Sequence, residues 1–401
     1  MEAFNPTRRM VLAGGGAVLG VAMVGGPAAL AQTGPITIGC LVPLTGAGSI
    51  YGPGMRDAIA AVVKQVNGAG GVLGRQIQLV TEDDQTNPEA AVRAIRKLIN
   101  VDGSIAVLGP WASAVAAAVA PVCWENQTLC AIVGSADSIT RLPHQGFLIR
   151  TQPSISMQAA RFGKLAIDLG GKSIYFLGPQ TPFTQTYIDV VAKMAHDKGL
   201  TFNSEIYDGS KTSFRSEIDH MRQANPDTVL LGGYVTDIAV VLRELYRANF
   251  TSRLIGFGTG INTSLLQGMP KEAVEGVYAV TPSASLQGSG YQKLAALVGN
   301  PAPGPFEAQA YDMINLTVMA IAQGGKGTGV GVRDAIRSVS QGDGTIVDNA
   351  LDGLALIAKG QKVNYEGASG SCDFDQYGDI IAAKFKIERV VNGALTTVEI
   401  S

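Results

Sequence analysis

The stretch ITIGCLVPLTG (Ile36–Gly46) contains the first element of the fold and the turn that ends it. Its first part, Ile36–Val42, is a short apolar run with the length of a buried strand, and Pro43 ends it. Met55–Asn67 then carries apolar residues at helical spacing, and Gly68 suits the position just past a helix end. The opening therefore predicts a strand followed by a helix.

The same alternation continues through the first part of the chain. Asn87-Pro88 has the pattern of a helix N-cap followed by proline at the first helical position. The predicted elements are strand Gln76–Glu82, a helix from Pro88 to Asn100, strand Ile105–Gly109, a helix from Ser113 and strand Leu129–Val133.

A second block repeats this rhythm. Its predicted elements are strand Ser173–Gly178, helix Thr184–Lys198, strand Thr201–Tyr207, helix Ser213–Ala224, strand Thr228–Gly232, helix Asp237–Asn249 and strand Arg253–Phe257. Alternating strands and helices form parallel sheets covered by helices. Two such blocks predict an α/β protein with two doubly wound parallel-sheet lobes.

Three segments are the predicted crossings of a hinge between the lobes: Thr151-Gln152-Pro153, Thr281-Pro282-Ser283 and the glycine-rich Gly367–Ser371. Lobe one would then be residues 32–151 plus 282–368, with further helices at Phe306–Ala322 and Gly331–Ser338, and lobe two residues 152–281 plus 369–401. Ligands of doubly wound sheets bind at the carboxyl ends of the strands. We therefore expect a cleft between the lobes that closes around a small solute by hinge motion.

The composition limits the possible functions. Hydrophobic residues make up 46% of the chain and charged residues 16%, as in globular proteins. A net charge of −2 argues against a general affinity for nucleic acid or anionic membranes. The three histidines offer few metal ligands, and the sequence has no P-loop, no G-x-S-x-G motif and no metal-ligand spacing. We expect no cofactor, no metal centre and no catalytic residue.

Residues 1–31 have the pattern of an export signal. Arg8-Arg9 precede the uncharged run Val11–Leu30, and Ala29-Leu30-Ala31 is an A-x-A site that predicts cleavage before Gln32. The paired arginines resemble a twin-arginine (Tat) signal, which predicts a periplasmic protein. A Sec signal with an ordinary basic region and an uncleaved membrane anchor are the alternatives.

Export makes disulfides possible. Cys123 and Cys130 flank a predicted helix-to-strand turn and form one candidate pair, which leaves Cys40 and Cys372 as the second. Buried free thiols are the alternative for all four.

Short motifs that occur in order along the mature chain indicate a family. They are Ile36–Gly46, Tyr51-Gly52, NGAGGVLGR at Asn67–Arg75, EDDQTNP at Glu82–Pro88, Gly232-Gly-Tyr234, Ala310-Tyr-Asp312 and CDFDQYGD at Cys372–Asp379. Together they resemble the leucine/isoleucine/valine-binding protein family, the type I periplasmic solute-binding proteins of ABC importers. The resemblance implies a monomeric, non-catalytic protein that binds a small solute between its lobes and delivers it to a permease and ATPase complex. A sensor that presents the solute to a signalling partner is the alternative.

The resemblance also implies binding residues at the start of the helix that begins at Ser113. The Ser113 hydroxyl and the free N–H groups there suit a carboxylate, and the matching serine of the family binds the ligand's α-carboxylate. Trp111 and Ala112 match the family positions just before it, with Trp111 stacked on the ligand or forming the pocket floor. A plain N-cap is the alternative for Ser113, and core packing is the alternative for Trp111.

Ser135-Ala136-Asp137 follows the strand that ends at Val133. In the family, backbone groups here bind both ends of an amino acid, and a threonine stands where this chain has Asp137. Asp137 would point its carboxylate into the cleft and attract a cation or an amide donor, or it would cap the next helix.

Five further positions complete the implied site. Tyr51, Phe183 and Tyr234 match aromatic positions of the family's pocket, with surface packing as the alternative for Tyr51. Amino-acid binders carry a glutamate that pairs with the ligand's ammonium where this chain has Gly258, next to Thr259. An amide or urea-like solute, or an aromatic or aliphatic acid, is therefore as compatible with the sequence as an amino acid, unless Asp137 binds the ammonium.

Overall fold

The computed structural model describes residues 34–400, and the chain from Pro35 onward forms one compact unit. The predicted signal segment, residues 1–31, lies outside the described residues. None of the helices between residues 34 and 400 has the length and apolar character that a bilayer crossing requires.

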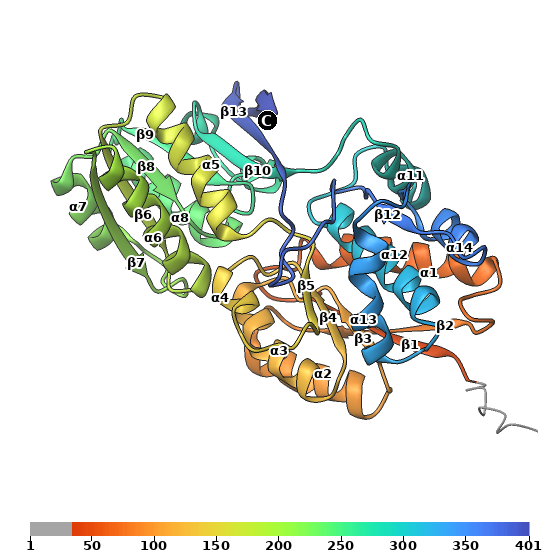
Figure 1. The fold of residues 1–401 in the computed structure, drawn as a ribbon. Helices are drawn as coiled ribbons and strands as arrows, with labels where there is room; N and C mark the ends of the chain where they lie inside the picture. Colours follow the sequence, from red (N-terminus) through yellow and green to blue (C-terminus); the bar gives the residue numbers. More distant parts are fainter. Residues whose placement is uncertain (1–33, 401) are drawn as a thin grey trace, which may run out of the picture. The chain divides into compact units, whose positions relative to one another are not determined.

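The sheet of lobe one has five parallel strands in the order β2-β1-β3-β4-β5 (Figure 1). These strands are β1 (Ile36–Val42), β2 (Ile77–Asp83), β3 (Ala106–Leu108), β4 (Leu129–Ile132) and β5 (Leu148–Arg150). The predicted first strand is confirmed, and all of its residues except Thr37 are buried.

The helices of lobe one are α1 (Gly52–Gly68), α2 (Pro88–Asn100), α3 (Ser113–Glu125), α4 (Asp137–Thr140), α11 (Ser289–Val298), α12 (Glu307–Gly324), α13 (Gly329–Ser340) and α14 (Ala350–Ile357), with a small parallel pair, β11 (Thr345–Val347) and β12 (Val363–Tyr365). The N-cap prediction for α2 is confirmed, because the Asn87 side chain accepts a hydrogen bond of 2.9 Å from the N–H of Ala90.

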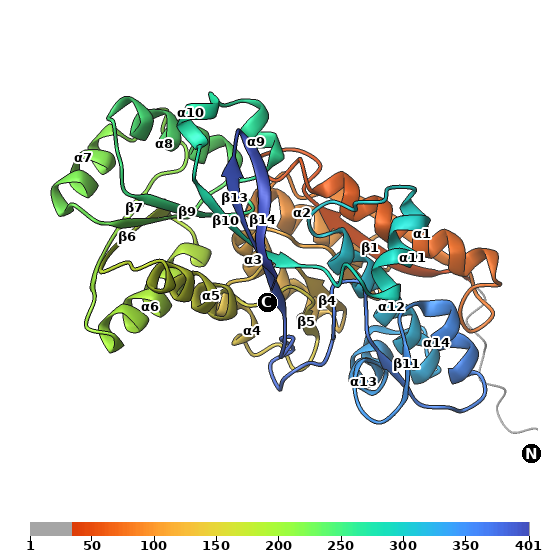
Figure 2. The same cartoon turned by 90° about the horizontal axis from the view of Figure 1, so that it is seen from above.

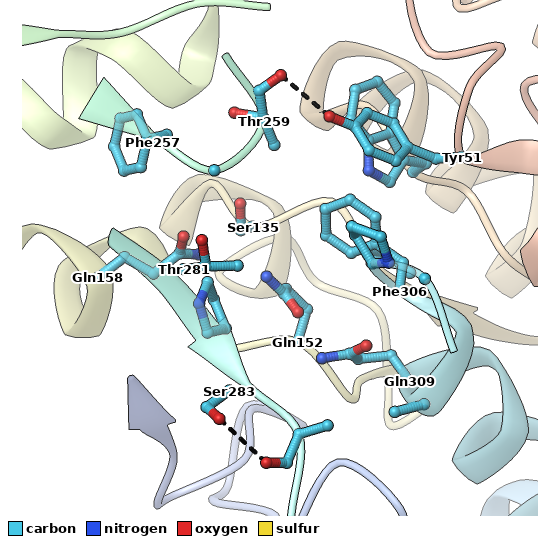
Figure 3. A pocket seen from close by; sticks show the side chains of 18 of the residues that line it. Tyr51, Ser135, Gln152, Gln158, Phe257, Thr259, Thr281, Ser283, Phe306 and Gln309 are labelled. Atoms are coloured by element: carbon cyan, nitrogen blue, oxygen red, sulfur yellow. Dashed lines mark hydrogen bonds between the residues drawn. The ribbon is translucent and has the colours of Figure 1, made fainter. Parts of the chain in front are cut away.

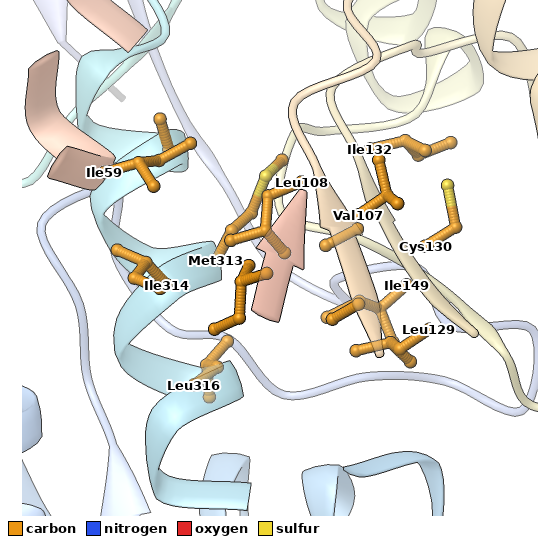
Figure 4. Packing of buried hydrophobic residues seen from close by; sticks show 14 of the residues in the cluster. Ile59, Val107, Leu108, Leu129, Cys130, Ile132, Ile149, Met313, Ile314 and Leu316 are labelled. Carbon is orange, nitrogen blue, oxygen red and sulfur yellow. The ribbon is translucent and has the colours of Figure 1, made fainter. Parts of the chain in front are cut away.

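Helix α12 is the central helix of this lobe. It is buried all round from Ala308 to Ile321, since it packs on the sheet and against α1, α13 and α14. Figure 4 shows Met313 and Leu316 of α12 beside Leu108 at the end of β3. A helix that is enclosed on all sides needs no exposed polar face, and its buried polar residues Asp312 and Asn315 are hydrogen-bonded within the lobe.

Lobe two has a seven-stranded sheet in the order β14-β13-β10-β9-β8-β6-β7 (Figure 2). Its strands are β6 (Ser173–Pro179), β7 (Thr201–Tyr207), β8 (Thr228–Leu231), β9 (Arg253–Phe257), β10 (Tyr278–Ser283), β13 (Lys384–Val391) and β14 (Ala394–Ile400), and its helices are α5 (Ile155–Asp168), α6 (Pro182–Asp197), α7 (Arg215–Ala224), α8 (Val235–Arg247), α9 (Thr263–Gln267) and α10 (Lys271–Val274). The four predicted strands β6–β9 are parallel, as predicted, and β10, which was not predicted, pairs parallel to β9. Strands β13 and β14 form an antiparallel hairpin that the sequence pattern did not indicate.

The third crossing lies later in the chain than predicted. The prediction placed it at Gly367–Ser371, but Cys372, Phe374 and Ile380 still pack in the core of lobe one. The reason is an ion pair of 2.7 Å between the fully buried Arg150 at the end of β5 and Asp379. The chain therefore leaves lobe one after this ion pair, and it enters β13 at Lys384.

Both predicted disulfides are absent, because all four cysteines are buried free thiols. Burial and the neighbouring Cys130 raise the pKa of the Cys123 thiol, and both buried cysteines pack as small apolar side chains. Burial also raises the pKa of Cys40, beside Thr81 of β2, to about 12. Cys372 lies 3.9 Å from the Asp312 carboxylate, so it has a neighbour other than Cys40.

Candidate functional site

A cavity of about 370 Å³ lies between the two lobes, at the carboxyl ends of strands from both sheets (Figure 3). It is lined by most of the residues predicted for the site: Tyr51, Trp111, Ala112, Ser113, Ser135, Phe183, Tyr234, Gly258 and Thr259. Ala136 and Asp137 are not part of its lining.

One wall of the cavity is aromatic and combines both lobes. The Trp111 ring lies 5.0 Å from the Tyr51 ring and 5.3 Å from the Tyr234 ring of lobe two. Phe306, just before α12, lies edge-on to Tyr51 at 5.1 Å, and its backbone has an unusual φ of +68° for a residue with a side chain. Such backbone strain is common at binding sites, where the surrounding contacts hold it in place.

A second aromatic pair lies on lobe two. Phe183, at the start of α6, packs edge-on against Phe257 at the end of β9 with ring centres 4.7 Å apart. Both rings line the cavity. The two aromatic walls suit a flat or bulky apolar ligand.

The start of α3 provides a polar seat. Ser113 is the first residue of this helix, and no side chain caps the first turn. The Ser113 hydroxyl accepts a hydrogen bond of 3.1 Å from the N–H of Ala136, which leaves its own proton free to donate. Helix N-terminal N–H groups together with a donating hydroxyl favour a negatively charged ligand group.

Asp137 does not point into the cavity, which is a correction to the sequence prediction. Its carboxylate accepts a hydrogen bond of 3.1 Å from the N–H of Ser156 and another from the hydroxyl of the same residue. Ser156 lies in the first turn of α5, where the helix dipole favours a carboxylate. Asp137 therefore joins α4 to the beginning of lobe two and is not placed to bind an ammonium group in the cavity.

Gly258 leaves no room for the side chain that amino-acid binders carry. A Cβ built on Gly258 would lie 2.1 Å from the Thr281 hydroxyl oxygen and 3.1 Å from its Cβ. A glutamate at Gly258 would therefore require the Thr281 side chain to move.

Lys386 is the single charged residue in the lining of this cavity. It lies opposite Thr281 in the β10–β13 pair, and its ammonium contacts Glu388 at 2.9 Å.

Asp237 contacts Tyr234 of the cavity wall but does not line the cavity itself. It accepts hydrogen bonds from the Tyr207 hydroxyl and the Tyr234 N–H, at 2.6 and 2.8 Å. Burial raises the pKa of Asp237, while its hydrogen bonds with Tyr207 and Tyr234 act in the opposite direction.

Direct hydrogen bonds join the lobes beside the cavity. The Tyr51 hydroxyl donates to the backbone oxygen of Thr259 at 2.9 Å, and it accepts from the side-chain amide of Asn262 at 3.2 Å. Burial raises the pKa of Tyr51 well above its ordinary value, so the hydroxyl keeps its proton. The Thr259 hydroxyl in turn donates to the backbone oxygen of Gly233 at 3.2 Å.

Several lining residues were not found from the sequence. They include Gln152, Gln158, Phe257, Thr281, Ser283, Phe306, Gln309 and Lys386. Gln152 stands inside the predicted crossing Thr151-Gln152-Pro153, and Thr281 and Ser283 stand inside the predicted crossing Thr281-Pro282-Ser283, so the hinge prediction could have placed these three in the cleft. The others lie at element ends that only the tertiary fold brings together.

The comparisons with known proteins now define the class. A model of the periplasmic binding protein family matches residues 35–371, and the chain belongs to this family of solute-binding proteins, which are not enzymes. The family predicted from the sequence motifs is confirmed.

Two relatives show what the chain is similar to. The chemotactic signal transduction system substrate-binding protein BasB of Halobacterium salinarum is 28% identical over 351 residues, covering 84% of this chain and 83% of its own. The leucine-, isoleucine-, valine-, threonine- and alanine-binding protein of Pseudomonas aeruginosa is 27% identical over 312 residues, covering 76% and 82%.

Two solved structures share the fold. The leucine-binding protein LivK of Thermotoga maritima has a TM-score of 0.78 at 20% identity, covering 91% of this chain and 98% of its own. A solute-binding protein of an ABC transporter from R. palustris, in complex with benzoate, has a TM-score of 0.74 at 18% identity, covering 92% and 96%. At these identities the likeness establishes the fold, a two-lobed type I periplasmic binding protein.

Proposed function

We propose that this protein is the periplasmic receptor of an ABC importer for a carboxylic acid that has an apolar or aromatic body and no ammonium group. It binds the acid between its lobes as a monomer and presents it to the permease and ATPase complex. The observation that carries the proposal is a cavity with a helix N-terminus, a lysine in its lining and no carboxylate side chain among the described lining residues.

The carboxylate of the acid is bound at Ser113. The first turn of α3 offers N–H groups and the Ser113 hydroxyl, and these groups favour an anion without needing a counter-ion. Lys386, whose ammonium is shared with Glu388 at 2.9 Å, adds a cationic group at the same cavity. Together they favour a ligand with a net negative charge.

An amino acid is less suited to this cavity than the matching acid. Its ammonium would be enclosed between aromatic walls with no carboxylate to pair with, and enclosing an unpaired charge costs several kcal/mol. The clamp residue is missing at Gly258, and Asp137 is engaged at the start of α5. The fold itself accommodates aromatic acids, as the R. palustris protein in complex with benzoate illustrates.

Solute sensing is the second candidate function. The similarity to a chemotactic substrate-binding protein favours it, because the same closed form can be read by a signalling partner as well as by a permease. Co-purification with a permease supports transport, whereas co-purification with a transducer supports sensing. Export by the twin-arginine route, suggested by Arg8-Arg9, completes the proposal.

Thermal unfolding with a panel of solutes tests the proposed ligand class. A ligand present at 100 times its dissociation constant stabilises a protein by about 2.7 kcal/mol, which shifts the melting temperature measurably. We expect benzoate and branched aliphatic acids to produce larger shifts than leucine, isoleucine and valine at equal concentration. Larger shifts with the amino acids would contradict the proposal.

A further inference from the structure

Three glutamines from separate parts of the chain line the cavity. Gln152 lies in the first crossing, Gln158 in the first turns of α5, and Gln309 in the first turn of α12. Their exposed fractions are 3%, 5% and 5%, so all three are enclosed by the protein. Figure 3 shows the three side chains around the same part of the cavity, with Thr281 and Ser283 beside them.

Their hydrogen bonds to the protein are incomplete. The Gln152 side-chain oxygen is buried and has no partner within the described chain. The Gln158 amide nitrogen donates to the backbone oxygen of Pro153 at 2.7 Å, so the group that it leaves for the cavity is its oxygen. Between residues 34 and 400, no group pairs with the Gln309 side-chain amide, while its backbone oxygen accepts from the Thr151 hydroxyl at 3.2 Å.

The hydroxyl of Ser283, beside the glutamines, is a further hydrogen-bond acceptor. Ser283 donates its proton to the backbone oxygen of Ala284 at 3.0 Å, which leaves its lone pairs for another partner. The amide oxygens of Gln152 and Gln158 and the Ser283 hydroxyl can therefore accept hydrogen bonds at this part of the cavity, next to the side-chain amide of Gln309. Buried acceptors without a donor cost free energy, and native proteins seldom leave them so.

We propose that Gln152, Gln158 and Gln309 form a second subsite that binds a hydrogen-bond donor on the body of the acid, a hydroxyl or a primary amide. This inference rests on the proposed function and narrows its ligand to a hydroxylated or carbamoylated carboxylic acid. A hydroxyl donates to an amide oxygen and accepts from the Gln309 amide. A second carboxylate cannot donate, and a methyl group leaves the acceptors unpaired.

Such a subsite discriminates by the cost of the unpaired groups. A site that is shaped to hydrogen-bond a hydroxyl rejects the analogue that lacks it far more strongly than an apolar pocket rejects an added group. For neutral partners, we expect a preference of about 10-fold or more for the donor-bearing ligand.

Matched aromatic acids test the proposal by isothermal titration of the purified protein. The probes are 4-hydroxybenzoate and 4-carbamoylbenzoate, which donate, and benzoate and 4-methylbenzoate, which do not. We expect the two donors to bind about 10-fold more tightly. The near-isosteric Gln152→Met and Gln309→Met should reduce this ratio to about threefold or less while benzoate affinity is kept, because only the partner of the donor is lost. Gln185→Met, at an exposed position of α6, is the control that should keep the native ratio.

The titrations distinguish a failure of the glutamine subsite from a failure of the proposed ligand class. If all four acids bind with equal affinity, or if neither methionine variant changes the ratio, the subsite is wrong and the proposed function stands. If none of the acids binds while leucine does, the proposed function is wrong, and the subsite falls with it. Unliganded melting temperatures of the variants, measured alongside, exclude misfolding as the cause of a lost ratio.

Discussion

At the scale of single residues, the chemistry of the cavity depends on a few side chains that are present or missing. The backbone at Gly258 passes so close to Thr281 that a Cβ would lie 2.1 Å from the threonine hydroxyl. The glutamate that amino-acid binders carry at this position would therefore clash with Thr281 as it stands. Lys386 is the charged residue among the described residues that line the cavity, and its ammonium is paired with Glu388 outside the lining at 2.9 Å.

Lys386→Gln tests the role of this charge. We expect affinity for a carboxylic acid to fall by about three- to tenfold, because a partly exposed ammonium attracts an anion by a modest, salt-screened amount. The dependence of affinity on ionic strength should weaken as well, which titrations at low and high salt would reveal. Lys384→Gln, at an exposed position two residues earlier on β13, is the matched control and should behave as the native protein. A native salt dependence in Lys386→Gln would contradict this role.

At the scale of elements, two helix N-termini lie near each other and have different partners. The first turn of α3 faces the cavity, whereas the first turns of α5 receive the Asp137 carboxylate through Ser156. The N-terminus of α3 is therefore free to bind a solute anion, whereas the N-terminus of α5 already binds the Asp137 carboxylate.

Asp137→Asn tests whether Asp137 stabilises the N-terminus of α5 or binds the solute. We expect the free energy of unfolding to fall by about 1 kcal/mol, because a charged acceptor near a helix N-terminus is replaced by a neutral one. Affinity for the acid should stay within a factor of about two, since the residue does not line the cavity. Urea unfolding and titration of the same preparation measure both quantities. A loss of stability smaller than that of solute affinity would show that Asp137 acts in the cavity after all.

His144, in the turn before β5, should make the free energy of unfolding depend on pH. Burial lowers the pKa of His144, whose Nδ1 accepts from the N–H of Gly146 at 3.2 Å. The folded state thus favours the neutral ring, so the stability that it contributes is complete above the unfolded pKa near 6.5 and is lost as the pH falls below it. We expect His144→Asn to flatten the fall of unfolding free energy between pH 6.5 and about pH 5, measured by denaturant titration. A slope equal to that of the native protein would contradict this.

The elements themselves were largely readable from the sequence, whereas the details of the site were not. Strand length and helical periodicity are local properties, so β1, α2 and most parallel strands of both sheets follow from the pattern, whereas β5 and β10 were not predicted. The β13–β14 hairpin and the late third crossing depend on distant contacts such as Arg150 with Asp379. The direction of Asp137 likewise depends on α5. Isolated glutamines carry no pattern, so the cavity position of Gln309 becomes visible only when α12 is packed.

At the scale of the whole molecule, the two lobes meet through hydrogen bonds that need no ligand. The Tyr51 hydroxyl of lobe one binds Thr259 and Asn262 of lobe two. These contacts stabilise the closed arrangement, and a solute gains affinity when closure is already favoured.

Asn262→Ser tests this contribution to closure. Serine can still cap α9, as Asn262 does through the N–H of Leu265, but it lacks the amide that donates to Tyr51. Asn262 does not line the cavity, so a loss of affinity of about threefold to tenfold would report on closure and not on direct contact. Small-angle scattering should show a larger radius of gyration without ligand. Unchanged affinity together with unchanged scattering would show that these hydrogen bonds do not contribute to closure.

The central claim is that the cavity accepts a carboxylate and excludes an ammonium, and one pair of ligands tests it directly. Leucine and 4-methylpentanoate share the same branched body and carboxylate and differ in the α-ammonium alone. Isothermal titration of the purified protein with both should give at least about tenfold tighter binding for 4-methylpentanoate, because the described residues that line the cavity include no carboxylate to pair with the ammonium. Tighter binding of leucine would contradict the claim.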